Sequence, residues 1–403
     1  MDPVIIKPAV TDEELRQASD LMAKAHFSDY YAGADHVGGV TAGYPGFMRE
    51  HVRIAVAGGH VAAALLLTTD TIRIGEARLR MGGFGCVTTA REHRRRGIIS
   101  LVMDDAMKYL RDHGHHAAML FGIPDFYHRW GFATALAEHS AAMDIREAEA
   151  AADVPFRMRG AKPGDIPVMQ KMHAANDQET ACSLIRTAAH MTSRWDRWRN
   201  VRVLLNTQGR VIAYFRGARV GADYVVDEAG VSGHEACGAV LRSVARLAHG
   251  ECVGRMKFLA PPSHPLIRHL LAYRADHDMR TDRGGGGMVA LVNVPEAMES
   301  MIPEWESRLR QSPLVGESAE VTLLLDRQPW RVRARRGAVD VTPGAGRNKV
   351  SLSAAELVQV LTGYRHLEEV LQSRRRIITA EGMALLAALF PKRVPYVWMM
   401  DRF

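Results

Sequence analysis

The sequence has 403 residues, which corresponds to two to four domains of ordinary size. Hydrophobic residues make up 47% and charged residues 24%, and these values exclude a largely disordered chain, a collagen-like repeat and a simple coiled coil. The net charge of +7 is compatible with an anionic ligand. The chain has no long Lys/Arg run and no array of stacking aromatic residues, so we expect no nucleic-acid partner.

The cysteines and the apolar runs indicate the compartment. The four cysteines are Cys86, Cys182, Cys237 and Cys252. None forms a C-x-x-C pair, so we expect reduced thiols and no structural zinc. The first residues lack the charged and apolar regions of a signal peptide, and no apolar run reaches about 18 residues. We therefore expect a cytoplasmic protein with no membrane partner.

The first of three blocks covers residues 1–147. Its predicted elements, in chain order, are a helix over 13–27, strands over 52–57, 61–69 and 78–89, a long helix that follows Gly97, a strand over 117–121 and a turn near 125–130. In the second helix Val102, Met103, Ala106 and Leu110 fall on one face at helical spacing, and Gly114 follows as a stop. This mixture of strands and amphipathic helices predicts an α+β domain.

The second block, residues 148–287, repeats the order of the first without its residues. Strands are predicted over 201–205, 211–216, 224–231 and 256–260, with helices over 234–249 and 265–272. The glycine-rich run 283–287 is interpreted as a linker to the third block, residues 288–403. There we expect strands over 289–294, 320–325, 330–335 and 338–341, and a helix over 357–361 that follows a capping box at Ser353 and Glu356.

The strongest chemical signal is the junction at residues 87–99, where a strand ends, a basic loop turns and a helix begins at a glycine. The loop carries Arg94, Arg95 and Arg96 directly before Gly97. A helix N-terminus presents unpaired N–H groups and a partial positive charge, and arginines add charge-assisted hydrogen bonds. The spacing suits a pyrophosphate, although a solvated basic loop at a helix start would give the same pattern.

This junction resembles the acetyl-CoA-binding motif of the GCN5-related N-acetyltransferases (GNAT). The resemblance implies that the backbone of Val87, Thr88 and Thr89 pairs with the pantetheine arm of acetyl-CoA. Pyrophosphate contacts would fall on Arg95, Arg96, Gly97, Ile98, Ile99 and Ser100. Gly122 and Ile123 would also contact the cofactor. The second block has Val231-Ser232-Gly233-His234 at the corresponding junction, so we expect an acetyltransferase fold there without coenzyme A.

The segment Phe126-Tyr127-His128-Arg129-Trp130-Gly131-Phe132 resembles the Tyr-x-[Lys/Arg]-x-Gly-Phe turn of the same enzymes. The resemblance places the hydroxyl of Tyr127 near the thioester sulfur. A phenol with a pKa of about 10 can give a proton to a departing thiolate. The alternative is a tyrosine that serves only the core or the turn.

The three-block organisation resembles the Eis (enhanced intracellular survival) family of acetyltransferases. That family combines a catalytic GNAT domain, a degenerate GNAT-like copy and a C-terminal domain similar to sterol-carrier protein. The resemblance implies a homohexamer and makes the C-terminal carboxylate, here that of Phe403, the catalytic base. The apolar run at residues 396–400 indicates a buried tail rather than a frayed terminus.

The positions that would face the acceptor amine depart from the pattern of aminoglycoside-acetylating members. Asp29 aligns with an acidic pocket position, but Cys86 replaces an aromatic residue and Arg402 replaces an acidic one. An arginine beside the base would repel a polycation unless it points away. Cys86 could itself accept an acyl group, or it could be a buried and inert thiol.

The sequence therefore predicts an acetyl-CoA-dependent N-acetyltransferase that transfers the acetyl group directly to an amine of a small polar substrate, with aminoglycosides as candidates. Two alternatives remain: a lipid- or small-molecule-binding protein that senses acetyl-CoA, and a protein-lysine acetyltransferase. No metal is expected, since the histidines at residues 113–116 lie at a predicted helix end, where exposure is normal.

Overall fold

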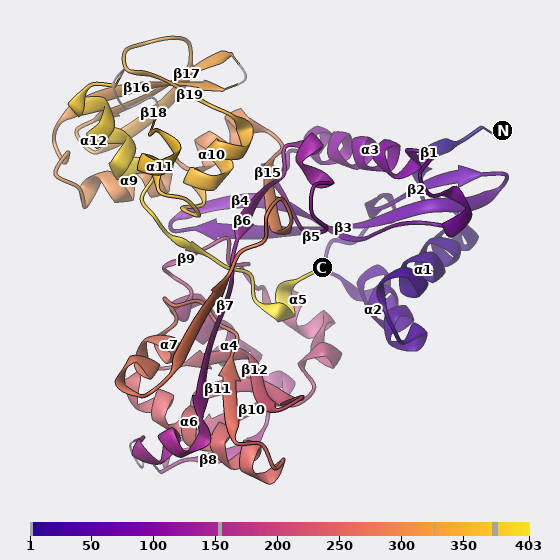
Figure 1. Ribbon diagram of the computed structural model, residues 1–403, viewed down its shortest axis with the longest axis vertical. Helices are drawn as coiled ribbons and strands as arrows, with labels where there is room; N and C mark the ends of the chain where they lie inside the picture. Colours follow the sequence, from indigo (N-terminus) through magenta and orange to yellow (C-terminus); the bar gives the residue numbers. More distant parts are fainter. Residues whose placement is uncertain (1–2, 152–154, 326, 373–377) are drawn as a thin grey trace.

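The computed structural model describes residues 3–151, 155–325, 327–372 and 378–403, and it has three lobes (Figure 1). Each lobe combines a β-sheet with helices, so the predicted α+β class is confirmed. Within the described residues, no helix combines the length and the hydrophobicity that crossing a bilayer requires.

The first lobe is built on a sheet of strand order β1-β2-β3-β4-β5-β15-β6. Its strands are β1 (Ile5–Pro8), β2 (Val52–Ala57), β3 (His60–Ile74), β4 (Ala77–Thr89), β5 (Ala117–Gly122), β15 (Gly286–Leu291) and β6 (Ala133–Leu136). The helices are α1 (Asp12–His26), α2 (Tyr30–Gly43) and α3 (Ile98–Asp112). Strands β4 and β5 are parallel, and every other pair in this sheet is antiparallel.

The second lobe repeats this topology. Read from β8, its sheet runs β8-β10-β11-β12-β13-β7-β14, and β12 and β13 form its parallel pair. The strands are β8 (Arg157–Gly160), β10 (Val201–Leu205), β11 (Val211–Val220), β12 (Asp223–Val231), β13 (Arg255–Phe258), β7 (Glu138–Asp144) and β14 (Asp276–Arg280). The helices are α4 (Ile166–Asn176), α5 (Ala188–Ser193), α6 (His234–Gly250) and α7 (Pro265–His269). The two sheets have the same strand order and the same position of the parallel pair, which fits the prediction of two tandem copies.

The two sheets exchange a strand. Strand β7 follows the first lobe in sequence but pairs with β13 and β14 in the second sheet. Strand β15 follows the second lobe but lies between β5 and β6 in the first sheet. The interpretation of residues 283–287 as a linker is therefore wrong for Gly286 and Gly287, which pair with Gly122 and Phe121. The glycines are needed for packing: a methyl group on Gly287 would lie 2.5 Å from Cβ of Leu136. The domain limits at residues 147 and 287 stay a prediction.

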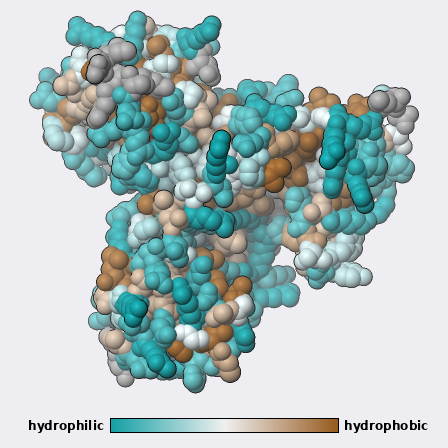
Figure 2. All heavy atoms as spheres, viewed as in Figure 1, coloured by the Kyte–Doolittle hydropathy of each residue, from teal (hydrophilic) through white to brown (hydrophobic). Residues whose placement is uncertain are grey.

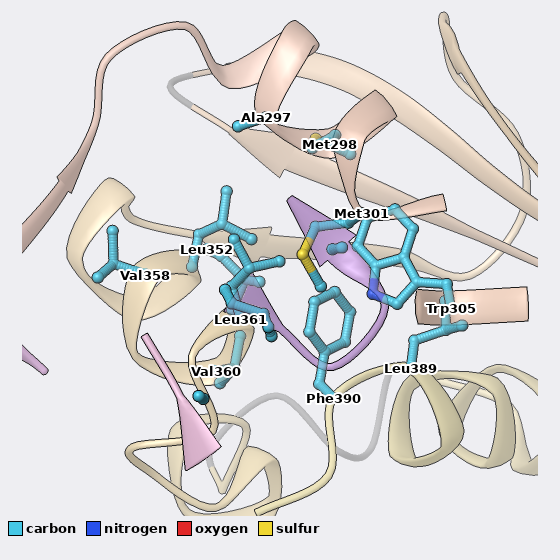
Figure 3. Packing of buried hydrophobic residues seen from close by; sticks show 14 of the residues in the cluster. Ala297, Met298, Met301, Trp305, Leu352, Val358, Val360, Leu361, Leu389 and Phe390 are labelled. Atoms are coloured by element: carbon cyan, nitrogen blue, oxygen red, sulfur yellow. The ribbon is translucent and has the colours of Figure 1, made fainter. Parts of the chain in front are cut away.

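The third lobe has a smaller sheet of order β18-β17-β16-β19. Its strands are β16 (Ser318–Leu325), β17 (Gln328–Arg335), β18 (Ala338–Pro343) and β19 (Lys349–Leu352), and its helices are α8 (Val294–Ser300), α9 (Ile302–Arg310), α10 (Ala354–Leu361), α11 (Leu367–Val370) and α12 (Ala380–Leu389). Figure 3 shows helices and strands converging on Trp305 and Phe390, whose rings lie 5.7 Å apart. Burying large aromatic and aliphatic side chains is the main stabilising contribution here. The likeness to sterol-carrier protein stays a prediction.

Most predicted elements are present within a few residues of their expected ends. The capping box at Ser353 and Glu356 is confirmed, with Ser353 as the N-cap of α10. The segment predicted as a strand over 289–294 differs: the strand ends at Leu291, and α8 begins at Val294 with a proline in its first turn. Pro295 explains the change, because proline favours the first turn of a helix and cannot donate to a strand.

The C-terminal tail crosses the molecule. It leaves the third lobe after α12, pairs through β20 (Val394–Pro395) with β9 (Thr180–Ala181) and ends in the first lobe (Figure 1). Tyr396, Val397 and Trp398 are each only 1% exposed, so the prediction of a buried tail is confirmed.

Candidate active site

The end of β4 separates from β5, which leaves the last residues of β4 unpaired on that side. The paired register of the two strands ends at Phe84 and Leu120, while β4 continues to Thr89. A bulge interrupts the pairing of β4 with β3 near Cys86, which adopts a positive φ of 52°. An extra residue in one strand bends it and increases its twist. The predicted partners of the pantetheine arm, Val87, Thr88 and Thr89, therefore lie on the part of β4 that is not paired with β5.

Two side chains already bind carbonyls on this stretch. His26, at the end of α1, lies with Nε2 3.1 Å from the carbonyl oxygen of Val87. Arg94 donates from Nε to the carbonyl oxygen of Thr89 at 3.2 Å. Arg94 thus ties the basic loop to the strand end, a positioning role that the sequence pattern did not reveal.

The basic loop leads into α3 as the motif predicts. Gly97 is the N-cap with a φ of 73°, a left-handed conformation that glycine adopts without strain. Arg95 has a φ of 61°, and Arg95, Arg96 and Gly97 are all exposed. The N-cap makes no side-chain hydrogen bond. The first N–H groups of α3, including those of Ile98 and Ile99, therefore have no side-chain cap at the place where a pyrophosphate would bind.

A further basic residue, Arg129, lies beside this helix end. Its Nη1 is 3.4 Å from Oγ of Ser100, and its guanidinium stacks over the rings of Phe126 and Trp130 at 4.9 and 5.1 Å. Trp130 in turn donates to Asp104 of α3 at 2.6 Å. Arg129 belongs to the turn that the sequence singled out, but only its contact with Ser100 identifies it as a possible phosphate ligand.

Tyr127 packs in the turn next to the end of β5. It is 8% exposed, contacts Phe126 and Phe132, and leaves no room for a side chain on Gly122. Burial raises the pKa of its hydroxyl above the ordinary value of 10. The group therefore remains protonated at neutral pH, as a proton donor must. Ile123 is 64% exposed beyond Gly122, so these two predicted cofactor contacts lie at the open end of β5.

Phe403 lies against the diverging part of β4. A methyl group on Gly85 would be 3.1 Å from the carboxyl carbon of Phe403, and one on Gly83 would be 2.5 Å from Cδ1 of its ring. The ring also lies 6.2 Å from that of Phe121 on β5. Phe121 directly precedes Gly122, against which Tyr127 packs. The chain terminus and Tyr127 are thus brought to the same pair of parallel strands.

A buried ion-pair network anchors the tail two residues before its end. Arg186, fully buried, donates to Asp401 at 2.8, 2.8 and 3.1 Å and to Glu228 at 2.7 and 2.8 Å. Tyr214 donates to Glu228 at 2.9 Å. Burial alone would raise the pKa of Asp401, but the charge and hydrogen bonds of Arg186 outweigh it and hold that pKa below its usual value. Arg186 and Glu228 belong to the second lobe, which therefore fixes the position of the C-terminus.

The guanidinium of Arg402, next to the predicted base Phe403, is engaged by other residues. It donates to Glu138 at 2.8 Å and stacks over the ring of Phe121 at 4.2 Å. The ion pair offsets its charge, so the predicted repulsion of a polycation by Arg402 is weakened.

The two predicted acceptor residues differ in their placement. Asp29 is exposed, and its Oδ1 accepts a hydrogen bond from the Tyr31 amide at 2.9 Å. Cys86 is half-buried against the apolar cluster under α1 and α2, and burial raises the pKa of its thiol to about 11. A protonated thiol is a poor nucleophile, which favours the inert alternative for Cys86.

Two arginines of the second lobe, which the sequence pattern did not single out, contact residues of the first lobe near α2. Arg197 donates to a ring nitrogen of His36 on α2 at 2.6 Å. Arg194 stacks on the ring of Tyr44 at 4.3 Å and is 6% exposed. Burial, with Arg197 close by, lowers the pKa of His36 to about 4, so it is neutral at pH 7. Arg194 directly follows α5, and Arg197 lies in the short 3-10 helix Trp195–Trp198, whose sequence matches no motif.

Comparison with known proteins agrees with the geometry. Residues 9–135 match the family model described as acetyltransferase (GNAT) domain. The chain carries a GNAT acetyltransferase domain. The prediction of an N-acetyltransferase is confirmed at this level, and the matched residues contain β4, the basic loop, α3 and Tyr127. No curated protein matches the chain.

Solved structures share the fold over the whole length. A GCN5-related N-acetyltransferase from Kribbella flavida is similar with a TM-score of 0.75 and 18% identity, covering 100% of this chain and 99% of that one. A GCN5-related N-acetyltransferase from Anabaena variabilis has a TM-score of 0.73 and 15% identity over 100% of both chains. Eis1 from Mycobacterium abscessus has a TM-score of 0.67 and 16% identity over 99% of this chain and 100% of its own. At these identities the likeness establishes the fold.

Proposed function

We propose that the protein is an acetyl-CoA-dependent N-acetyltransferase of the Eis type, which acetylates an amine of a small polar substrate. The observation that carries this proposal is the joint placement of the diverging end of β4, the uncapped start of α3 and the buried Tyr127 within the residues that match a GNAT domain. Phe403 lies beside Gly85 on β4, and Arg186 holds the preceding tail through Asp401, which supports the carboxylate of Phe403 as the base.

In the proposed reaction the acceptor amine attacks the thioester carbonyl directly. The Phe403 carboxylate, directly or through one water, takes the ammonium proton. A backbone N–H of β4 stabilises the oxyanion, and Tyr127 donates its proton to the sulfur. The exposed Arg95 and Arg96, the uncapped start of α3 and Arg129 would hold the phosphates of acetyl-CoA.

We propose a small polar amine as the acceptor, with aminoglycosides as candidates. Support for them comes from the ion pair of Arg402 with Glu138, which offsets a charge that would otherwise repel a polycation. By the same resemblance we propose a homohexamer, which sedimentation of the purified protein would test. We also propose a cytoplasmic location, since Cys86, Cys182, Cys237 and Cys252 are all free.

The deciding experiment measures thiol release from acetyl-CoA with three acceptor classes: aminoglycosides, small neutral amines and lysine-containing peptides. We expect turnover with a small amine, and its loss when Phe403 is deleted or when a C-terminal tag converts the carboxylate into an amide. Deletion moves the terminus by about 3.5 Å, beyond hydrogen-bond reach. The same tag at the N-terminus is the matched control.

Each outcome is informative. Acetyl-CoA binding without turnover on any amine would favour the sensor alternative, and turnover on peptides alone would favour a protein-lysine acetyltransferase. Full activity of the deleted and C-terminally tagged proteins would place the base elsewhere.

A further inference from the structure

A cavity of about 750 Å³ lies in the second lobe, away from the acetyl-transfer groove. Its walls come from α4, β11, the end of β12, the start of α6 and α7. The volume falls within the roughly 300–1,000 Å³ typical of small-molecule sites. In the duplicated topology, β12 and α6 correspond to β4 and α3, so the cavity occupies the place of the cofactor groove in the first lobe.

The cavity differs chemically from that groove. Both backbone groups of Val231, at the end of β12, are taken by the side chain of Asn176, which accepts from its N–H at 2.8 Å and donates to its C=O at 3.0 Å. A pantetheine arm would have to displace Asn176 from both of these groups, whereas the side-chain bonds to Val87 and Thr89 in the first lobe occupy only their carbonyl oxygens. Only Ser232 and Gly233 separate β12 from α6, whereas residues 90–97 form the basic loop of the first lobe. The cavity therefore lacks both the strand docking and the phosphate loop of a coenzyme A site.

Much of its lining is apolar, although Asn176, Ser232, His234 and His269 also belong to it. Val168, Met172, Val211 and Cys237 line it. Cys237 is 1% exposed, donates weakly to the Gly233 carbonyl at 3.6 Å, and has a thiol pKa that burial raises to about 12. The thiol is therefore neutral at any physiological pH and behaves as a small apolar group. Each methylene that an aliphatic ligand buries there should tighten binding by about fourfold.

Its rim is positive. Lys171 and Arg268 line the cavity, and none of the lining residues is an aspartate or a glutamate. Arg268 forms an ion pair with Glu179, whereas no ion pair of Lys171 occurs among the described residues. The N-cap of α6, Gly233, makes no side-chain hydrogen bond and lines the cavity together with His234, so the start of this 17-residue helix borders the cavity without a side-chain cap. A helix start and a nearby ammonium together favour a negatively charged group.

We propose that this cavity binds an amphipathic monocarboxylate, with its apolar chain against Met172 and Cys237 and its carboxylate between Lys171 and the start of α6. The site is separate from acetyl transfer, and the proposal does not rest on the proposed function. It assigns the degenerate lobe a ligand of its own.

The test uses calorimetric titration of the full-length protein with decanoate, decylammonium and decanol below their aggregation concentrations. We expect one decanoate per chain, bound at least tenfold more tightly than decylammonium or decanol. Lys171→Glu should reduce decanoate affinity about tenfold or more, while Lys162→Glu, an exposed charge reversal on the same lobe outside the cavity, should leave it unchanged. Ala175→Trp should abolish binding by filling the cavity.

Acetyl-CoA affinity, measured on the same samples, should be unchanged in every variant. Equal binding of the three probes would overturn the carboxylate assignment, and so would equal effects of Lys171→Glu and Lys162→Glu. Decanoate binding that survives Ala175→Trp would place the ligand elsewhere. If that variant does not fold, a chain-length series on the unmodified protein replaces it: affinity should stop rising once the cavity is filled, and a steady rise would refute a site of this volume.

Discussion

Gly83→Ala perturbs the terminal carboxylate without touching any group that takes part in the chemistry. A methyl group at this position would lie 2.5 Å from Cδ1 and 2.7 Å from Cε1 of the Phe403 ring. Ordinary van der Waals contact begins at 3.4 Å, so the ring must retreat by about 1 Å. A misplacement of 1 Å costs on the order of 100-fold in rate. We therefore expect turnover to fall about 100-fold, with unchanged affinity for acetyl-CoA.

The methyl group would also lie 2.5 Å from Oγ1 of Thr68, so a double-mutant cycle is needed to separate the two effects. Phe403→Ala removes the ring but keeps the terminal carboxylate. If Gly83→Ala acts through the ring, it should have little further effect in the F403A background. Gly160→Ala, which meets nothing within 4 Å, is the control for adding a methyl group to a strand.

The assay is steady-state thiol release with a saturating amine, together with thermal unfolding of each variant. Full turnover of Gly83→Ala would refute the reasoning, because the ring would then have moved without displacing the base. An equal loss in both backgrounds would assign the effect to Thr68 or to the strand itself.

Three further predictions follow from the site. Replacing Arg95 and Arg96 together by Ala should raise the KM for acetyl-CoA far more than that for the amine, because hydrogen bonds to charged groups contribute roughly 1.5–3 kcal/mol each; unchanged acetyl-CoA binding in a calorimetric titration would remove the assignment. Tyr127→Phe should slow turnover by about 10²–10⁴-fold with nearly unchanged acetyl-CoA affinity; since burial raises the pKa of Tyr127 above 10, any loss of activity below pH 9 must come from another group. Asp401→Asn should reduce the free energy of unfolding by about 3–5 kcal/mol at pH 7, because it leaves the buried Arg186 short of one partner. Because the pKa of Asp401 is lowered in the folded protein, the ion pair contributes its full stability above the unfolded-state pKa of about 4. This stability is lost as the pH falls through the folded-state pKa, so the free energies of unfolding of the two proteins should converge in acid. A difference that does not change with pH would contradict the ion-pair explanation.

The cofactor groove was predictable because its signals are local. A strand, an Arg-x-x-Gly loop and an amphipathic helix follow one another within residues 78–112, and each is specified by its own residues. The structure retains all three, with Gly97 at the helix start. The turn at Tyr127 is local in the same sense.

Other features depend on contacts that no local pattern encodes. Helix α2 contains four glycines, which disfavour a helix, and it was not predicted. Gly286 and Gly287 resemble a linker because glycine weakens an isolated strand, yet Gly287 leaves room for Leu136 and Gly286 has a positive φ of 67°. Arg186 and Asp401 are 215 residues apart, and only the folded tail brings them together.

The reciprocal exchange of β7 and β15 affects the order in which the two sheets can fold during synthesis. While the chain is being synthesised, the first sheet has a vacancy between β5 and β6 until Leu291 has emerged, by which time the second sheet has its own strands in place. A fragment that stops near residue 147 would expose two unpaired strand edges, and such edges promote aggregation. The first two lobes therefore form a single folding unit, and a soluble fragment has to extend at least through β15.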